Sequence, residues 1–420
     1  MEYPKILIIS HNCFSASGSN GRTLANFFDG YPVEKLAQFY IYNEMPSVSV
    51  CKNYYRITDT DAVRSLMGKS CGLKIKQVDS QQETVSSGKM ERKPRKTPLV
   101  YLIREMVWKL GRWNNRSLQK WIDDFDPEAV LLQAGDAGFL FDFAYQTAKT
   151  RGIPLVIYNS ESYYFKDTNY LQQSFGSDCW YGILHRYFRK KAAKAIRYAK
   201  WSIYISDVLR KTYDDEFGVP STTVMTSSGL LGSGEMPKAE NITISYLGNL
   251  GVGRYETLIE LSKILQSIDP ALCIDVYGNA SEDVVKAFDG ADGIRYVGFV
   301  SYEECVRIMK QSTILVHVEN FSEFYLTDSK YAFSTKIADS LACGTCLFVY
   351  APAQLGCSQY LMENEAACVA SEPEEARKKL EMLLCNEKIR RLYEQQAKIT
   401  AVENHSLERN REKFLGVLCK

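Results

Sequence analysis

The segment from Asp328 to Tyr350, DSKYAFSTKIADSLACGTCLFVY, predicts a loop, a short helix and a buried strand. Ser334 and Thr335 are residue types that commonly cap the start of a helix. Gly344 follows at the place where a glycine often ends a helix. Cys346–Tyr350 is continuously apolar, which is typical of a strand covered on both faces of a parallel sheet. The segment therefore indicates an α/β fold.

Lys336 lies in the first turn of this expected helix, where its positive charge opposes the helix dipole. The position is favourable if an anion also binds there, because the free amide groups and the ammonium would both face a phosphate. The other interpretation is an exposed surface lysine near a helix start. The residue alone does not decide between the two.

The length and composition of the chain restrict its class. A chain of 420 residues exceeds one typical core, so two domains of similar size are expected. The formal net charge of +1 gives no electrostatic reason to expect nucleic acid as a partner. No apolar run is long enough to span a membrane, and Lys5–Ser10 suits a first strand better than a secretory signal. The 12 cysteines are scattered, so reduced thiols and a cytoplasmic location are expected.

Alternating strand and helix patterns predict two Rossmann-like parallel-sheet domains, at residues 1–235 and 236–388. The charged segment 389–420 is expected to be helical and to cross back onto the first domain. Residues 68–98 are polar and look like a mobile insertion. Strands are expected in the first domain at residues 6–10, 36–42, 129–133, 155–158 and 202–206, and in the second at 242–247, 272–277, 294–297, 314–318 and 346–350.

Polar loops follow the strands of the first domain. Loops at the carboxyl edge of a parallel sheet bind ligands in open α/β folds. Asp136 and Glu161 follow two such strands and are candidates for contacts to substrate hydroxyls, although Asp136 also suits a helix cap and Glu161 a solvated acid. The loop after the first strand, which precedes a helix expected from Thr23, adds further candidates: His11, Asn20, Gly21 and Arg22.

Two expected helical segments of the first domain are amphipathic and basic, at residues 99–122, where Gly111 suggests a break, and at residues 183–200. Basic residues beside apolar and tryptophan side chains suit the surface of an anionic membrane. Packing of the apolar side against the core, with a solvated basic side, is the commoner explanation. A peripheral contact with the inner face of a membrane is therefore an open expectation.

The second domain begins with a strand and a glycine-rich turn, Gly248–Arg254. Gly251 and Gly253 would let a diphosphate approach the backbone, and Arg254 would neutralise it. A dinucleotide fingerprint has the spacing Gly-x-Gly-x-x-Gly, whereas the turn here has Gly-x-x-Gly-x-Gly, so a nicotinamide cofactor is discounted.

Two further patterns suggest metal or redox chemistry and are each better explained otherwise. Asp59 and Asp61 form a D-x-D pair that can hold a divalent metal, but Asp59 is equally placed to cap a helix. Cys343 and Cys346 stand at a helix end without a second ligand pair, so packed thiols are favoured over zinc or redox activity. We expect no metal and no cofactor.

The two halves, the glycine turn with its arginine and the run Ser-Thr-Lys-Ile-Ala-Asp-Ser-Leu-Ala-Cys-Gly before a late strand resemble GT-B glycosyltransferases. The retaining family-4 type of bacterial polysaccharide biosynthesis is the best match. The resemblance covers most of residues 1–385 in layout and is specific mainly in residues 245–350. It implies two Rossmann-like domains that face a central cleft.

The resemblance implies roles for several residues. Arg254 matches the family's basic residue on the donor diphosphate, and Lys336 would supply the second charge, because no lysine follows Arg254 closely. Asp339 matches the second of two acids that are separated by seven residues, whereas the first falls on Tyr331. The alternative candidates for the first acid are Glu319, Glu323 and Asp328. The first-domain histidine that is common in the family is not evident. The implied catalytic residues are Arg254, Lys336 and Asp339, and the implied donor-binding residues are Gly21, Arg22, Gly251, Gly253, Phe299, Val300, Ser334 and Thr335.

The implied reaction moves a hexose-type sugar from a nucleoside diphosphate sugar to a hydroxyl of a glycan or polyprenyl-linked acceptor, with retention and without a metal. His11, Asn20, Asp136 and Glu161 are the acceptor-side candidates. A non-catalytic partner protein of the same fold stays open because Tyr331 replaces the first acid. A nicotinamide-dependent oxidoreductase is the weaker alternative.

Overall fold

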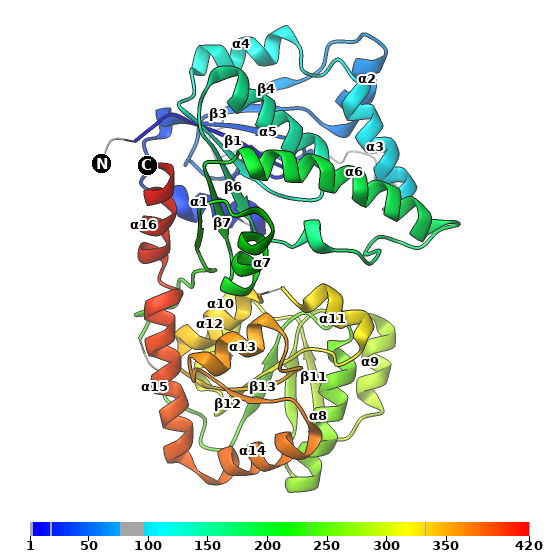
Figure 1. Cartoon of the computed structure of the whole chain (residues 1–420). Coiled ribbons are helices and arrows are strands. Elements are labelled where there is room, and N and C mark those ends of the chain that lie inside the picture. The colour runs from blue at the N-terminus through cyan, green and yellow to red at the C-terminus, as the bar shows by residue number, and fades with distance from the viewer. Residues whose placement is uncertain (1–2, 17–18, 76–95, 235, 332, 420) are drawn as a thin grey trace. The chain divides into compact units, whose positions relative to one another are not determined.

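The computed structural model describes residues 3–16, 19–75, 96–234, 236–331 and 333–419, which form two compact units. Unit 1 contains the chain up to Val224 and the segment from Arg411 onward, and unit 2 is Met225–Asn410 (Figure 1). The sequence predicts a domain boundary near residue 235 and a final segment that begins at residue 389. The units divide earlier, after Val224, and unit 2 extends further along the chain.

Unit 1 is built on a sheet with the strand order β4-β3-β2-β1-β5-β6-β7-β8 among the described residues. All neighbouring strands are parallel except β3 and β4, which are antiparallel. Every residue of β1, β2, β5 and β6 is buried, as expected for strands covered by helices on both faces. The strands are β1 (Ile6–Ser10), β2 (Leu36–Tyr40), β3 (Asn53–Arg56), β4 (Leu73–Ile75), β5 (Ala129–Gln133), β6 (Leu155–Asn159), β7 (Trp201–Tyr204) and β8 (Ser221–Thr223).

The helices of unit 1 differ from the sequence expectation in where they start. The first begins at Ser19 rather than Thr23, so Asn20, Gly21 and Arg22 are helical, and α6 begins at Ser177 rather than at residue 183. The expected helical segment 99–122 is divided at Gly111, because α3 ends at Leu110 and Asn115 caps α4. The helices are α1 (Ser19–Phe28), α2 (Asp59–Leu66), α3 (Pro98–Leu110), α4 (Arg116–Phe125), α5 (Gly138–Arg151), α6 (Ser177–Tyr198), α7 (Asp207–Phe217) and, from Arg411 onward, α16 (Leu407–Leu418), with 3₁₀ turns at Val33–Lys35 and Tyr163–Phe165.

The expected insertion at residues 68–98 contains β4, and α3 begins at its end. Residues 76–95 of this expected mobile insertion lie outside the described residues. Among the described residues, no helix combines the length and the apolarity that a membrane crossing requires.

Unit 2 contains a sheet of parallel strands in the order β11-β10-β9-β12-β13-β14. This order and that of unit 1 confirm the expected α/β class with two Rossmann-like domains. The strands are β9 (Ile244–Leu247), β10 (Ile274–Tyr277), β11 (Ile294–Gly298), β12 (Ile314–Val318), β13 (Cys346–Tyr350) and β14 (Cys368–Ala370). The helices are α8 (Arg254–Ile268), α9 (Glu282–Asp289), α10 (Tyr302–Gln311), α11 (Glu323–Ser329), α12 (Thr335–Cys343), α13 (Gly356–Glu363), α14 (Pro373–Cys385) and α15 (Glu387–Asn404).

The segment around α12 and β13 follows the sequence prediction closely. Ser334 is the residue before α12, although its side chain makes no capping hydrogen bond. Gly344 follows the helix with φ of 65°, in the left-handed region where glycine is favoured. β13 is buried along its whole length between β12 and β14.

Candidate functional site

A pocket of about 400 Å³ in unit 2 lies at the carboxyl ends of β9, β10 and β11, beside the start of α12. Gly278 allows the strand ends to approach closely, because a Cβ atom there would collide with the carbonyl oxygen of Gly248. The residues that line the pocket are Leu247, Gly248, Asn249, Tyr277, Gly278, Asn279, Phe299, Val300, Cys305 and Lys336.

Three of the residues expected to bind a donor lie in this pocket. Lys336, in the first turn of α12, is half-buried and is the one cation among the described lining residues. The Phe299 side chain is 73% exposed, so its ring is open to a planar ligand. Val300 lies beside it. A cation near a helix start, together with an open aromatic ring, suits an anionic ligand that carries a base.

Arg254 does not line this pocket. Its guanidinium donates two hydrogen bonds to the carboxylate of Glu319, at 2.7 and 3.0 Å. Glu319 is 4% exposed and also lies 3.2 Å from Nε2 of His317. Burial raises the pKa of Glu319, but His317 and Arg254 together lower it more, so the pKa lies below its ordinary value. The charge of Arg254 is therefore already paired within unit 2.

The glycine turn before α8 is held in shape by Asn320. The amide of Asn320 donates to the carbonyl of Gly253 at 2.9 Å and to Glu256 at 3.0 Å. Gly253 has φ of 68°, and a Cβ atom there would collide with the Asn320 amide. The backbone N–H of Gly251 donates to Asn249 at 2.8 Å, and Asn249 lines the pocket.

The remaining donor-side candidates of unit 2 lie on α12 or just before it, outside the pocket lining. Asp339 accepts a hydrogen bond from the hydroxyl of Ser228 at 2.6 Å. Ser334 is half-buried and Thr335 is exposed. Tyr331, at the place of the family's first acid, is also half-buried.

A pocket of about 360 Å³ in unit 1 lies where β1, β5 and β6 end. Its lining includes all four acceptor-side candidates, His11, Asn20, Asp136 and Glu161, because the carboxyl ends of adjacent parallel strands meet at one sheet edge. The aromatic rings of Tyr42, Tyr101, Tyr163 and Tyr170 also line it, together with Gln133. The sequence analysis did not single out these tyrosines or Gln133. The only signal for Gln133 was its place as the last residue of an apolar strand.

The side chains of His11 and Asp136 lie close together in this pocket. Nε2 of His11 lies 3.3 Å from Oδ1 of Asp136. The ring of His11 packs against Gly135, where a Cβ atom would collide with it. Burial raises the pKa of Asp136, but His11 and the guanidinium of Arg104 lower it more, so the pKa lies below its ordinary value. Asp136 does not cap α5, because the residue before that helix is Ala137.

Gly21 and Arg22, expected near the donor, lie in α1 of unit 1. Gly21 is buried, and a Cβ atom there would collide with the carbonyl oxygen of Cys13. Arg22 is exposed. Neither residue is in the lining of the unit 1 pocket.

The patterns that suggested metal or redox chemistry have protein partners. Asp61 closes a capping box with Thr58, and Asp59 accepts hydrogen bonds from Arg104 at 2.8 Å and Trp108 at 2.7 Å. Within the described ranges, no three or more His, Cys, Asp or Glu side chains are grouped to hold a metal ion. Cys343 and Cys346 are free, and burial raises the pKa of the Cys343 thiol to about 12.

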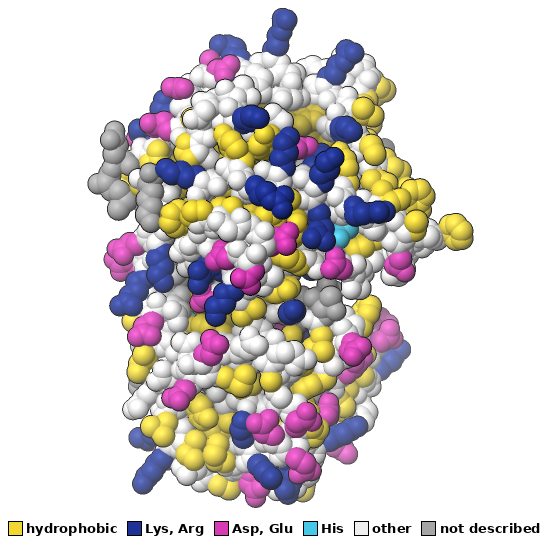
Figure 2. Space-filling model, in the orientation of Figure 1, with side chains coloured by type: hydrophobic (Ala, Val, Ile, Leu, Met, Phe, Trp, Pro, Cys, Tyr) yellow, Lys and Arg dark blue, Asp and Glu magenta, His cyan; other side chains and the backbone are white. Residues whose placement is uncertain are grey.

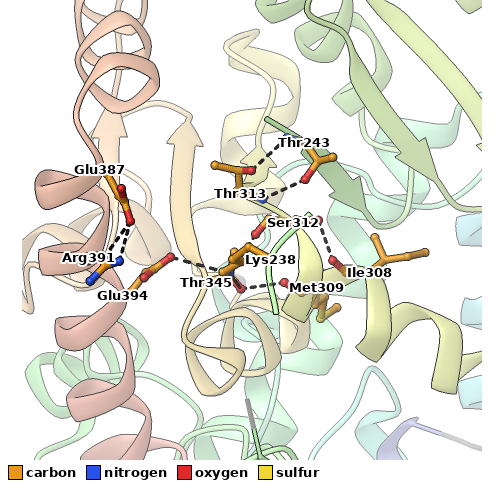
Figure 3. Close-up of polar contacts among 10 residues, drawn as sticks. All are labelled: Lys238, Thr243, Ile308, Met309, Ser312, Thr313, Thr345, Glu387, Arg391 and Glu394. Carbon is orange, nitrogen blue, oxygen red and sulfur yellow. Dashed lines mark hydrogen bonds and ion pairs between the residues drawn. The ribbon is translucent and has the colours of Figure 1, made fainter. Parts of the chain in front are cut away.

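A larger groove of about 710 Å³ lies at the opposite, amino ends of the unit 2 strands, beside α15. Its charged groups bind protein groups (Figure 3). The ammonium of Lys238 donates to the carbonyl of Ser312 at 2.9 Å and to the hydroxyl of Thr345 at 2.8 Å, and lies 3.8 Å from Glu394. Arg391 pairs with Glu387 at 2.7 Å. These contacts explain the charges without a ligand.

The comparisons with known proteins agree with this architecture. Residues 259–416 match the family model described as "Glycosyl transferase-like". No curated protein matches the chain in sequence.

Solved structures resemble the chain over nearly its whole length. HepE of Anabaena, in complex with UDP, has a TM-score of 0.66 and 10% identity, with 99% of each chain covered. Sucrose-phosphate synthase of Thermosynechococcus elongatus has a TM-score of 0.64 and 10% identity, with 98% of this chain and 97% of that one covered. WaaG, a glycosyltransferase involved in lipopolysaccharide biosynthesis, has a TM-score of 0.57 and 11% identity, covering 98% and 99%.

At such low identity these likenesses establish the fold alone, which is the GT-B fold. Residues 259–416, in unit 2, match the glycosyl transferase-like family model. The GT-B part of the resemblance that the sequence indicated is thereby confirmed.

Proposed function

We propose that the chain transfers a hexose-type sugar from a nucleoside diphosphate sugar to a hydroxyl group of a glycan or polyprenyl-linked acceptor, in surface polysaccharide synthesis. The observation that carries the proposal is the unit 2 pocket with Lys336 at the start of α12. The UDP complex of HepE and the role of WaaG in lipopolysaccharide biosynthesis support the choice of donor and of pathway class.

The leaving diphosphate gains negative charge as the bond between sugar and phosphate breaks. Lys336 and the free amide groups at the start of α12 would stabilise that charge, and this requires no metal. The Phe299 ring and the backbone at Val300 would hold the base of the nucleotide. Retention of configuration belongs to this proposal through the family-4 resemblance alone.

Arg254 and Asp339 need a rearrangement to act on the donor. Arg254 would reach a diphosphate by exchanging Glu319 for it, and Gly251 and Gly253 would let the phosphates approach the turn. Asp339 would hold a ribose hydroxyl in place of Ser228. Ser334 and Thr335 would contribute polar groups at the start of α12. Gly21 and Arg22, in α1 of unit 1, are assigned to the donor by the family resemblance alone.

The acceptor would bind in the unit 1 pocket. His11, Asn20, Asp136 and Glu161 line that pocket and can bind hydroxyl groups. His11, Asp136 and Glu161 follow the ends of adjacent strands, and this position supports the assignment, because the same edge carries ligands in open α/β folds.

A peripheral contact with the inner face of an anionic membrane would bring a polyprenyl-linked acceptor to the enzyme. Leu99, Ile103, Met106 and Leu110 form an exposed apolar stripe along α3, with Ile103 54% and Leu110 67% exposed. Basic side chains gather over α6 on the face of unit 1 that Figure 2 shows, and the exposed ones are Arg186, Lys190, Lys194, Arg197 and Lys200. Apolar and basic groups on one unit suit an anionic lipid surface.

The first experiment is a thermal-shift screen of the full chain with UDP-, GDP-, ADP-, CMP- and dTDP-sugars, with NAD alongside. A ligand at about 100 times its dissociation constant stabilises a protein by about 2.7 kcal/mol. We expect one nucleotide class to raise the melting temperature, and Lys336→Ala to remove the shift and reduce transfer at least about tenfold, or about 1.4 kcal/mol of transition-state stabilisation.

Lys263→Ala, an exposed lysine of α8, is the matched control and should keep both the shift and the activity. An unchanged shift in Lys336→Ala would remove this residue from the donor site. Nucleotide-sugar binding without transfer or hydrolysis would favour the second candidate function, a non-catalytic partner protein, which Tyr331 at the place of the first acid makes credible.

A further inference from the structure

Unpartnered polar atoms gather at the unit 1 pocket. Both amide atoms of Gln133 are buried without a hydrogen-bond partner among the described residues. Gln133 is 3% exposed and lines the pocket. Nδ2 of Asn159, at the end of the neighbouring strand β6, is also buried without a hydrogen-bond partner among the described residues. Asn159 lines a small adjoining cavity, and Glu161 and Tyr163 line both this cavity and the pocket.

Buried polar groups are nearly always hydrogen-bonded, because each unpaired one lowers the stability of the fold. A hydrophobic residue of similar size at position 133 would avoid that loss at the end of β5. Several such groups around one cavity therefore indicate a ligand that completes their hydrogen bonds.

The chemistry of the pocket restricts the ligand. The amide of Gln133 offers one acceptor and two N–H donors, and each hydroxyl of a sugar can both donate and accept. Two neighbouring hydroxyls on a sugar ring can thus satisfy both ends of the amide. The tyrosine rings of the lining offer apolar faces to the C–H groups of the same ring. The lining contains the two acids Asp136 and Glu161 beside the bases Lys96 and His11, so it has no excess of positive charge to attract a phosphate.

We propose that the unit 1 pocket binds an uncharged sugar ring with two neighbouring hydroxyls, and that Gln133 is the residue that selects it. This proposal adds to the proposed function and rests on it for one point only, which is that the bound sugar is part of the acceptor. Binding of a free sugar to the pocket can be tested without the donor.

The test uses saturation-transfer NMR and thermal shift on the full chain. The probes are the methyl glycosides of glucose, galactose and mannose, with inorganic phosphate and glycerol 3-phosphate as anionic counterparts. We expect at least one glycoside to bind, and Gln133→Met, which keeps the volume but lacks the amide, to weaken its affinity at least tenfold. The same variant should melt at a higher temperature than the wild type without sugar, because an unpaired buried amide is gone.

The matched control is Ser202→Ala. Ser202 lies in β7 and carries another buried, unpartnered hydroxyl, but it lines neither the pocket nor the adjoining cavity of unit 1. This variant should leave glycoside affinity unchanged. If Gln133→Met does not fold, Gln133→Glu is the second variant. It keeps the shape and the acceptor oxygen of the amide but replaces the two N–H donors by a second acceptor. It should therefore change the preference among the three glycosides.

Several results would overturn the proposal. They are no glycoside bound by the wild type, the same glycoside affinity in the Gln133 variants, or binding of the anions in place of the sugars. A lower melting temperature of Gln133→Met would assign the amide a structural role and also contradict it. The nucleotide screen separates the two hypotheses. If no nucleotide sugar raises the melting temperature of the wild type, the proposed function is refuted. The sugar site is then still tested by the binding of the glycosides.

Discussion

At the scale of single residues, the two pockets differ in how far the sequence predicted them. His11, Asp136 and Glu161 were predictable because each follows a strand, and adjacent parallel strands end at one edge. Gln133 was not, because burial without a partner is a property of the folded environment and not of the residue type. The partner of Arg254 was also hidden, because Glu319 is 65 residues away in the chain.

The pair of Arg254 and Glu319 gives a prediction for stability and pH. Removing one partner of a buried ion pair typically costs about 3 kcal/mol, because the other charge stays buried without compensation. We expect Glu319→Gln to destabilise unit 2 by about this amount at neutral pH. All five tryptophans of the chain lie before Val224, so the measurement is unfolding followed by circular dichroism rather than by tryptophan fluorescence.

The pH dependence distinguishes the charge from the shape of the side chain. The pKa of Glu319 lies below its ordinary value of 4.5, so the wild type holds the full stabilisation above that pH. It loses the stabilisation as the pH falls through the lower native pKa. The difference between wild type and variant should therefore shrink in acid. A difference that stays constant with pH would mean that packing, and not charge, holds Arg254.

At the scale of elements, prediction worked where one segment carried its own signals. The helix α12 and strand β13 follow from a capping residue, a helical apolar spacing, a terminal glycine and an apolar run. Four short strands with weaker patterns, β3, β4, β8 and β14, were not expected. The break between α3 and α4 was suggested only by Gly111, since the apolar residues continue at helical spacing through it.

The exposed stripe of α3 leads to a prediction about membranes. We expect the chain to bind vesicles that contain phosphatidylglycerol and to bind neutral phosphatidylcholine vesicles weakly, because the apolar stripe and the basic residues act together. The double variant Ile103→Ser with Leu110→Ser should reduce this binding at least about tenfold, since fully burying one leucine or isoleucine contributes about 1.5–3 kcal/mol. Co-sedimentation with vesicles measures it.

The matched control lies on α15. Leu392 and Ile399 are also exposed, by 65% and 50%, and have the same spacing of seven residues as the α3 pair. Leu392→Ser with Ile399→Ser should leave vesicle binding unchanged. An equal loss in both double variants would show a general effect of surface polarity, and α3 would then have no special role.

At the scale of the whole molecule, unit 1 contains both the first part of the chain, up to Val224, and the segment from Arg411 onward. The sequence predicted a helical final segment that crosses back, from its charge and position alone. The contacts that hold this final segment against unit 1 could not be predicted, because they join residues 385 and 382 positions apart in the chain. Arg411 donates to the carbonyl of Asn26 at 3.0 Å and pairs with Asp29 at 2.7 Å.

Phe414 is the side chain of α16 that tests this arrangement. It is fully buried, stacks on Phe27 with ring centroids 4.6 Å apart and meets Phe28 and Tyr158 edge to face. Replacing a buried phenylalanine by alanine typically costs about 3–5 kcal/mol. We expect Phe414→Ala to lower the unfolding free energy of unit 1 by this amount, and tryptophan fluorescence reports that unit alone.

Lys413→Ala, an exposed neighbour on the same helix, should change the stability by less than about 0.5 kcal/mol. The variant Phe414→Ala should also leave the nucleotide-induced stabilisation of unit 2 in place, because the donor pocket and its lining lie wholly within that unit. An unchanged tryptophan transition in Phe414→Ala would mean that α16 is not part of the unit 1 core. If Phe414→Ala lowers the stability of unit 1 alone and donor binding is retained, the residues of α16 are part of the core of unit 1.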